Sequence, residues 1–70
     1  MFDMAGVGKR ISSARKNINI TQMELADKLN VSFQAVSNWE RGVSMPDIAK
    51  LPDIAVILNL SIDELLGKEG

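Results

Sequence analysis

The 70-residue chain contains no cysteine and no histidine, and these two absences restrict its chemistry. Without cysteine no disulfide can form, and without either residue type the common zinc sites are excluded. Small domains often use a disulfide or a metal to compensate for a small core, so this one must depend on packing alone. We therefore expect no metal and no cofactor. The absence of cysteine also fits a reducing, intracellular setting.

Long apolar runs are also missing. No segment approaches the roughly 18 apolar residues that a membrane-spanning helix needs, and the N-terminus lacks the basic-then-apolar order of a secretory signal. There is no glycine-rich phosphate loop, and so short a chain has little room for a deep pocket. We expect neither an enzyme nor a small-molecule ligand site, and we expect a cytoplasmic protein without a membrane partner.

The net charge of −1 is low for a protein that would contact phosphates, but the charges are unevenly distributed. Residues 1–42 carry six basic and four acidic side chains, whereas residues 43–70 carry two basic and five acidic ones. This asymmetry indicates that one face could meet an anion while another faces solvent or a partner.

Helical periodicity and helix-boundary signals predict an all-α domain, and strand signals are missing. The domain is expected over residues 7–67. Residues 1–6 would form a flexible tail, and residues 68–70 a second tail or the start of a linker. The expected helices cover residues 7–17, 21–29, 32–41, 51–58 and 62–66.

The second predicted helix has the clearest boundaries. Thr21 and Glu24 have the spacing of a capping box, in which each side chain bonds the backbone amide of the other residue. Asn30 follows the last turn and suits a left-handed C-terminal cap.

The third helix follows after a short turn. Ser32 is a favoured N-cap, and Gly42 is the preferred residue just past a helix end. Two helices joined by about three residues, with Val31 as the apolar anchor of the turn, predict a helix-turn-helix over residues 21–41.

The third helix, Ser32–Arg41, has two distinct faces at 3.6 residues per turn. Val36, Trp39 and Glu40 share the inner face, where Trp39 is expected to be core rather than a stacking platform. The outer face carries Phe33, Gln34, Ser37, Asn38 and Arg41.

The outer side chains suit base recognition. Amides can pair bidentately with adenine in the major groove, a hydroxyl can serve several bases, and the Phe33 ring could contact a thymine methyl group. The alternative is an ordinary amphipathic helix with a solvated polar face. An exposed phenylalanine favours an interaction surface.

Two further features have structural explanations. Asp63 and Glu64 stand in the first turn of the last helix, where they complement its dipole, so a catalytic role is the lesser alternative. Met23 and Met45 are expected to fill gaps in the core.

The stretch from Thr21 to Gly42, TQMELADKLNVSFQAVSNWERG, resembles the phage-repressor and Cro class of helix-turn-helix proteins, also called the Xre family. The tail LNLSIDELL resembles the closing helix of that family, and the match spans roughly residues 11–67. The resemblance implies a five-helix, lambda-repressor-like domain that binds double-stranded DNA. It also implies a transcriptional repressor that binds a palindromic operator as a homodimer in a bacterial or phage setting, associated with the nucleoid.

The resemblance also implies roles for individual residues. Gln34, Ser37 and Asn38 would reach base edges, with Phe33 where the helix enters the groove. Gln22, Ser32 and Arg41 would contact DNA phosphates, and Gln22 would also brace the recognition helix. Arg15 would pair with Glu40, and Ile62 and Leu65 would contribute to a dimer interface.

The Arg15–Glu40 pair has a physical reason. A bare carboxylate on the inner face would be costly, and an arginine can satisfy it bidentately. The alternative is that both are surface charges.

The sequence departs from the family in the loop Val43–Asp47, which contains no basic residue. Fewer phosphate contacts predict weaker binding and a shallower salt dependence. A competing hypothesis is a protein-interaction module, antitoxin-like or adaptor, on the same fold, because fold alone does not determine function.

Overall fold

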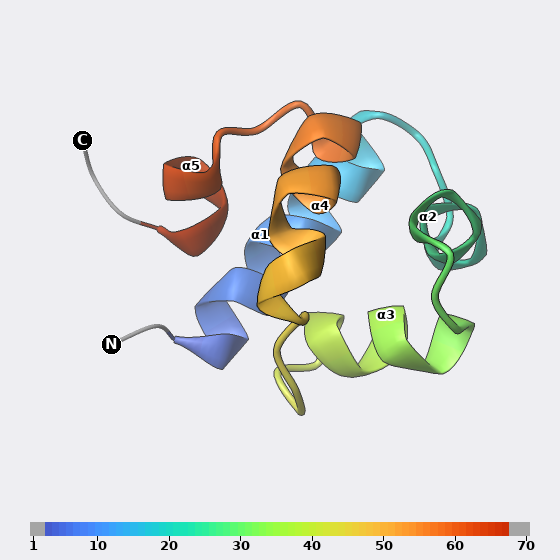
Figure 1. Ribbon diagram of the computed structural model, residues 1–70, viewed down its shortest axis with the longest axis horizontal. Coiled ribbons are helices and arrows are strands. Elements are labelled where there is room, and N and C mark those ends of the chain that lie inside the picture. The colour runs from blue at the N-terminus through green and yellow to red at the C-terminus, as the bar shows by residue number, and fades with distance from the viewer. Residues whose placement is uncertain (1–2, 68–70) are drawn as a thin grey trace.

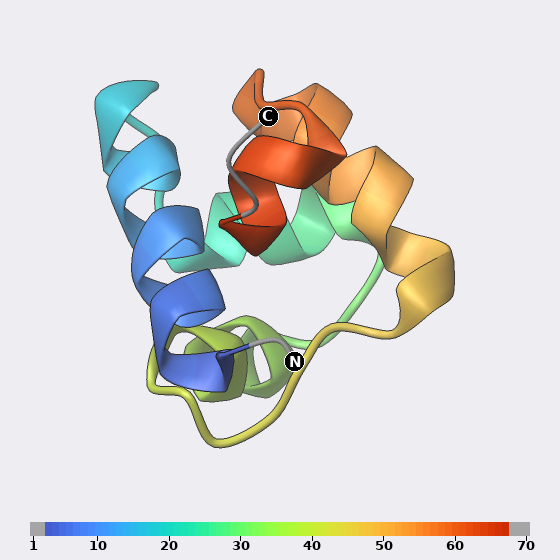
Figure 2. The same ribbon diagram turned by 90° about the vertical axis from the view of Figure 1, so that its left-hand side faces the viewer.

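The computed structural model describes residues 3–67, and within that range it contains only helices and connecting turns. Three pairs of packed helices define the arrangement: α1 lies against α3 and against α5, and α2 lies against α3 (Figures 1 and 2). The elements are α1 Met4–Asn17, α2 Gln22–Leu29, α3 Phe33–Glu40, the 3-10 turn η1 Ile48–Lys50, α4 Leu51–Leu58 and α5 Ile62–Leu66.

The first helix begins earlier than the sequence indicates. It starts at Met4 instead of Val7, because the Asp3 side chain accepts a hydrogen bond from the Ala5 amide and caps the helix. Residues 4–6 are therefore helical, and the expectation that they belong to a flexible tail is wrong. The predicted tail at residues 68–70 lies outside the described residues.

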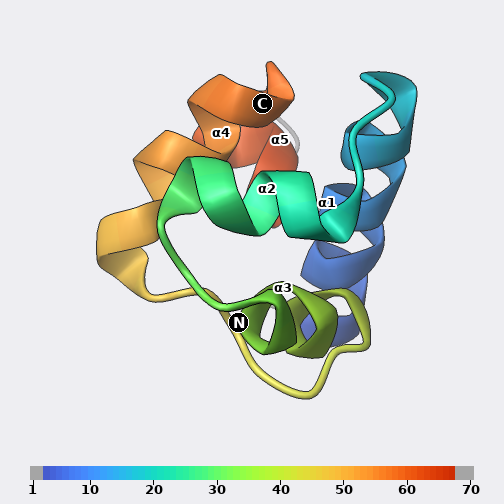
Figure 3. The same ribbon diagram turned by 90° about the vertical axis from the view of Figure 1, so that its right-hand side faces the viewer.

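The boundary signals of the helix-turn-helix are confirmed. Thr21 and Glu24 form both bonds of the capping box, and Asn30 adopts a left-handed conformation with φ 57°. Ser32 caps α3, and Gly42 follows it at φ 75°. In Figure 3, α2 runs across the view above α3, which is seen end-on, so the two helices cross steeply.

The later helices follow their predicted bounds. α4 begins at Leu51 with Pro52 in its first turn, although the short turn η1 precedes it. α5 begins after Ser61, which forms a second capping box with Glu64. Asp63 and Glu64 both lie in the first turn of this helix, so they have the structural role that was expected of them.

One core connects all five helices. Its fully buried side chains come from α1, α2, α3, α4 and α5, which is why no helix can leave without exposing apolar surface. Val31 and Met45 pack against it, as predicted. The largest fully buried side chains are Ile11, Leu25, Ile54, Leu65, Val7 and Val36.

A lysine at the end of η1, just before α4, is hydrogen-bonded to the end of α2. Lys50 Nζ donates a hydrogen bond of 2.9 Å to the Leu29 carbonyl, one of the carbonyls left free at the end of α2. Within residues 3–67, no helix is long and apolar enough to cross a membrane.

Candidate nucleic-acid interface

Helix α3 is divided into a buried and an exposed face. Val36 and Trp39 are buried, at 0% and 5% exposure, and Trp39 is core as expected. Phe33, Gln34 and Arg41 are exposed, while Ser37 and Asn38 are partly exposed. The five residues predicted for base and phosphate contact on this helix therefore share an accessible surface.

Helix α1 supports α3 at very close range. A Cβ atom on Gly8 would collide with the Trp39 carbonyl oxygen and lie 3.0 Å from that of Glu40. Only glycine allows this approach between two backbones. The contact fixes the position of the C-terminal half of α3, from which Asn38 and Arg41 project.

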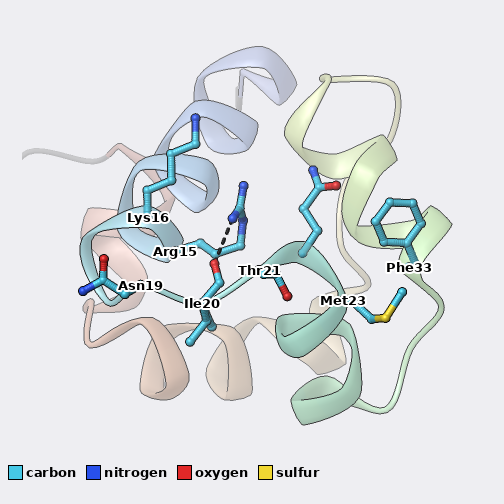
Figure 4. Close-up of a pocket in the computed structure, with 8 residues that line it drawn as sticks. Arg15, Lys16, Asn19, Ile20, Thr21, Met23 and Phe33 are labelled. Atoms are coloured by element: carbon cyan, nitrogen blue, oxygen red, sulfur yellow. Dashed lines mark hydrogen bonds between the residues drawn. The ribbon is translucent and has the colours of Figure 1, made fainter.

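The predicted Arg15–Glu40 pair is formed. Arg15 Nε donates to Glu40 Oε2 at 2.7 Å and Nη2 donates to Oε1 at 3.0 Å, with the side chains only 11% and 6% exposed. A further bond of 2.9 Å runs from Nη1 to the Ile20 carbonyl (Figure 4). The two charges are thus an enclosed pair that connects α1 to α3, and the surface-charge alternative is wrong.

Glu40 is held ionised by this network. Burial alone would raise the pKa of its carboxyl, but hydrogen bonds from Arg15 and Gln22 and the arginine charge outweigh burial and lower that pKa below 4.5. The same hydrogen bond raises the pKa of Arg15. Both groups therefore stay charged at neutral pH.

Gln22 belongs to this network and braces α3, as the family resemblance implied, although its partner Glu40 was not predicted. Its Nε2 donates to Glu40 Oε1 at 3.0 Å. An amide nitrogen carries two hydrogens, so one remains for another acceptor. Glu40 thereby fixes the direction in which Gln22, at the start of α2, can offer its second N–H.

An open hollow of about 690 Å³ lies where the end of α1 meets the starts of α2 and α3 (Figure 4). Arg15 and Lys16 lie on one side of it and Met23 and Phe33 on the other, and Gln22 also lines it. Its donors and positive charges suit a phosphate group. Ser32, just before α3, accepts a bond from the Ala35 amide, which leaves its hydroxyl hydrogen free to donate.

Met23 and Phe33 form an exposed apolar pair at the edge of the hollow (Figure 4). They are 61% and 47% exposed. The expectation that Met23 fills a gap in the core is wrong, because its place on α2 points it out of the three-residue apolar stripe formed by Leu25, Ala26 and Leu29. Both side chains can contact an apolar group of a ligand.

The outward amides of α3 are hydrogen-bonded to each other. Gln34 Nε2 donates to Asn38 Oδ1 at 3.0 Å, and Arg41 Nη2 donates to the same oxygen at 2.6 Å. This chain of bonds was not predicted from the sequence, although the spacings i, i+4 and i, i+3 on one helix are the signal that could have indicated it.

The two residues expected at a dimer interface lie in different environments. Ile62 is 40% exposed at the start of α5, whereas Leu65 is fully buried in the core of the same protomer. Leu65 has no surface to offer to a second copy, so of the two expected residues only Ile62 is accessible. Within residues 3–67, no three acidic side chains converge to hold a metal ion.

Comparison with known proteins adds to this geometry. A helix-turn-helix family model matches residues 11–65. The chain is 41% identical over 63 residues to the HTH-type transcriptional regulator ImmR of Bacillus subtilis, covering 90% of this chain and 50% of that protein. It is 37% identical to the CTXphi transcriptional repressor RstR of Vibrio cholerae, covering 89% and 55%. The chain thus spans about half the length of these curated relatives.

Among solved structures, the fold resembles the P22 c2 repressor protein crystallised in complex with synthetic operator 9T. The TM-score is 0.84 at 35% identity, covering 90% of this chain and 96% of that one. With the capped turn, the crossing of α2 and α3 and the enclosed Arg15–Glu40 pair, these matches show that the chain belongs to the phage-repressor type of the helix-turn-helix family.

Proposed function

We propose that this domain binds double-stranded DNA in a sequence-specific manner, with α3 in the major groove, as part of a transcriptional repressor. The observation that carries the proposal is the accessible face of α3, on which Gln34, Ser37 and Asn38 lie together over a rigidly buried inner face. Side chains of these types read base edges in the major groove. The operator-bound P22 c2 repressor and the repressor RstR support the same function.

The phosphate contacts in this proposal come from the hollow beside α3 and from Ser32, which caps the start of that helix. Gln22 and Ser32 each keep one hydrogen to donate, and Lys16 adds a positive charge. Such contacts position a protein on the duplex without reading its sequence. Base specificity then depends on α3.

We also propose that two copies bind a palindromic operator, with Ile62 at the contact between them. Two helix-turn-helix units reading half-sites one helical turn apart is the arrangement that two-fold symmetric operators match. The loop without basic residues makes a single copy a weak binder, so that a second copy is needed for affinity. The protein would act in the cytoplasm, at the nucleoid.

Selection from a random duplex library, read by sequencing, tests the proposal. We expect an enriched half-site that appears twice with two-fold symmetry. Gln34→Ala and Asn38→Ala should each remove the preference at the base position that the side chain reads and weaken binding to the selected sequence, while the circular dichroism melt stays unchanged. Asn17→Ala is the matched control, because it removes an exposed amide at the end of α1 that is neither part of α3 nor among the residues lining the hollow.

A protein partner is the second candidate, favoured by the exposed pair Met23 and Phe33 and by the acidic second half of the chain. If no duplex is enriched over random DNA at low salt, the DNA-binding proposal fails. The apolar pair would then be the surface to test by substitution in partner capture.

A further inference from the structure

The exposed face of α3 carries a continuous hydrogen-bonded chain formed by Gln34, Asn38 and Arg41. Asn38 Oδ1 accepts two bonds, from Gln34 Nε2 at 3.0 Å and from Arg41 Nη2 at 2.6 Å. Because the chain is complete before any ligand arrives, it determines which atoms of the two amides remain available.

The direction of every bond in the chain is set by Arg41. A guanidinium has donors only, so the atom of Asn38 that faces it must be the oxygen. The same oxygen then faces Gln34, which must present its nitrogen. Neither amide can be turned over without placing two donors or two acceptors against each other.

The acceptor capacity of Asn38 is therefore used up. An amide oxygen has two lone pairs, and both are occupied, while its Nδ2 keeps two free hydrogens. Gln34 retains its oxygen and one hydrogen. Asn38 is available as a donor only, whereas Gln34 is available as both donor and acceptor.

The backbone holds Asn38 and Arg41 in this relation. The Asn38 carbonyl accepts from the Val43 amide at 2.9 Å, and the Arg41 amide donates to the Ser37 carbonyl at 3.1 Å. Gly42 turns the chain back at φ 75°, so that the loop after α3 folds onto the last turn. The backbone of Arg41 is thus fixed at the end of the exposed face of α3.

We propose that Arg41 is a specificity-determining positioning residue, which fixes the Asn38 amide so that it reads a base edge with acceptors only, such as guanine N7 and O6. The inference rests on the proposed DNA binding and deepens it. Adenine presents a donor and an acceptor together, so a bidentate pair with adenine would come from Gln34 and not from Asn38. The inference also gives Arg41 a role other than the phosphate contact that the family resemblance implies.

The test compares wild type with Arg41→Met, which keeps an unbranched apolar stem and removes the donors of the side chain. Selection with Asn38→Ala first identifies the base position that Asn38 reads. Four synthetic duplexes that differ only at this position are then titrated with each protein. We expect wild type to prefer guanine there and Arg41→Met to lose this preference by about tenfold relative to adenine, because Asn38 regains an acceptor.

A double-mutant cycle shows whether Arg41 acts through Asn38. In the Asn38→Ala background, Arg41→Met should leave the ranking of the four duplexes unchanged. Lys16→Met is the charge control. It should weaken all four duplexes equally and lower the salt slope by about one unit.

Two results would overturn the inference. If Arg41→Met behaves like Lys16→Met, with uniform weakening and an unchanged base ranking, Arg41 is a phosphate contact and the proposed DNA binding survives. If wild type enriches no duplex, the proposed function and this inference fail together.

Discussion

Arg15 on α1 and Glu40 at the end of α3 are joined by two parallel hydrogen bonds across 25 positions of sequence. The pair links the supporting helix to the helix that we propose reads DNA. Buried pairs of this kind add little net stability, because desolvation offsets their attraction, but they fix one geometry and make the loss of either partner costly.

Removing Arg15 alone should therefore destabilise the domain strongly. Arg15→Ala leaves the Glu40 carboxylate enclosed without its main partner, and we expect a loss of about 2–4 kcal/mol in urea denaturation. The double variant Arg15→Met/Glu40→Leu should recover much of this loss. Lys16→Ala, one residue along and exposed, is the control and should change little. An unchanged melting temperature for Arg15→Ala would contradict the role of the pair.

Stability should fall on acidification because of the same carboxylate. The pKa of Glu40 is lowered in the folded state, so its contribution is complete above the ordinary value of 4.5 and is lost as the pH falls below it. Glu24 and Glu64 in the two capping boxes also have lowered pKa values and act with the same sign.

Urea denaturation at a series of pH values between 7 and about 3 measures this dependence. Glu40→Gln should be less stable than wild type at pH 7 but should lose less stability on acidification. If both proteins lose the same stability over this range, the titration of Glu40 is not the cause.

The close approach of α1 and α3 predicts opposite effects at two glycines of one helix. Gly8→Ala places a methyl group against the Trp39 carbonyl and should cost about 1–3 kcal/mol. Gly6→Ala meets only side-chain ends, the Arg10 guanidinium and the Asp3 carboxylate oxygen that does not accept the capping bond. Since alanine favours a helix, Gly6→Ala should be neutral or stabilising by up to about 1 kcal/mol. Equal melting temperatures for the two variants would contradict the close contact.

A basic residue introduced into the loop after α3 should strengthen DNA binding. Val43 is exposed, and the loop lacks basic residues. Val43→Lys should tighten DNA binding and steepen the salt dependence by about one unit of slope, if the lysine neutralises one phosphate. Val56→Lys, at an exposed position on α4 rather than in the loop after α3, is the control and should leave the slope unchanged.

The proposed dimer contact can be separated from folding. Ile62 exposes 40% of its surface, so Ile62→Lys should change the free energy of unfolding by less than about 0.5 kcal/mol. It should nevertheless weaken cooperative binding to a two-fold site, measured by gel shift with one and two half-sites. If both half-sites still fill together, the contact lies elsewhere.

Local signals in the sequence predicted most helix boundaries because each cap acts within four residues. Thr21, Asn30, Ser32 and Gly42 all adopt the conformations that their residue types favour. The exception is α1, whose cap Asp3 precedes a segment with two glycines that reads as irregular. The Arg15–Glu40 pair, by contrast, was accessible only through the family resemblance, since nothing local connects the two positions.

Side-chain relations across elements were less predictable. The bond from Gln22 to Glu40 and the bond from Lys50 to Leu29 depend on how three helices pack, which no spacing along the chain specifies. Periodicity also failed to separate Leu65 from Ile62, because a five-residue helix is too short to define a stripe. The base-reading residues remain predictions that rest on their shared exposed face.

The burial of Trp39 gives the domain a built-in optical probe. It is the one tryptophan of the chain, it is 5% exposed, and it lies on the face of α3 opposite the amides. Its fluorescence emission should shift to longer wavelength when the core opens, yet it should change little when a duplex covers the outer face. The folding of every variant can thus be followed in an unlabelled sample, with or without DNA present, and separately from binding.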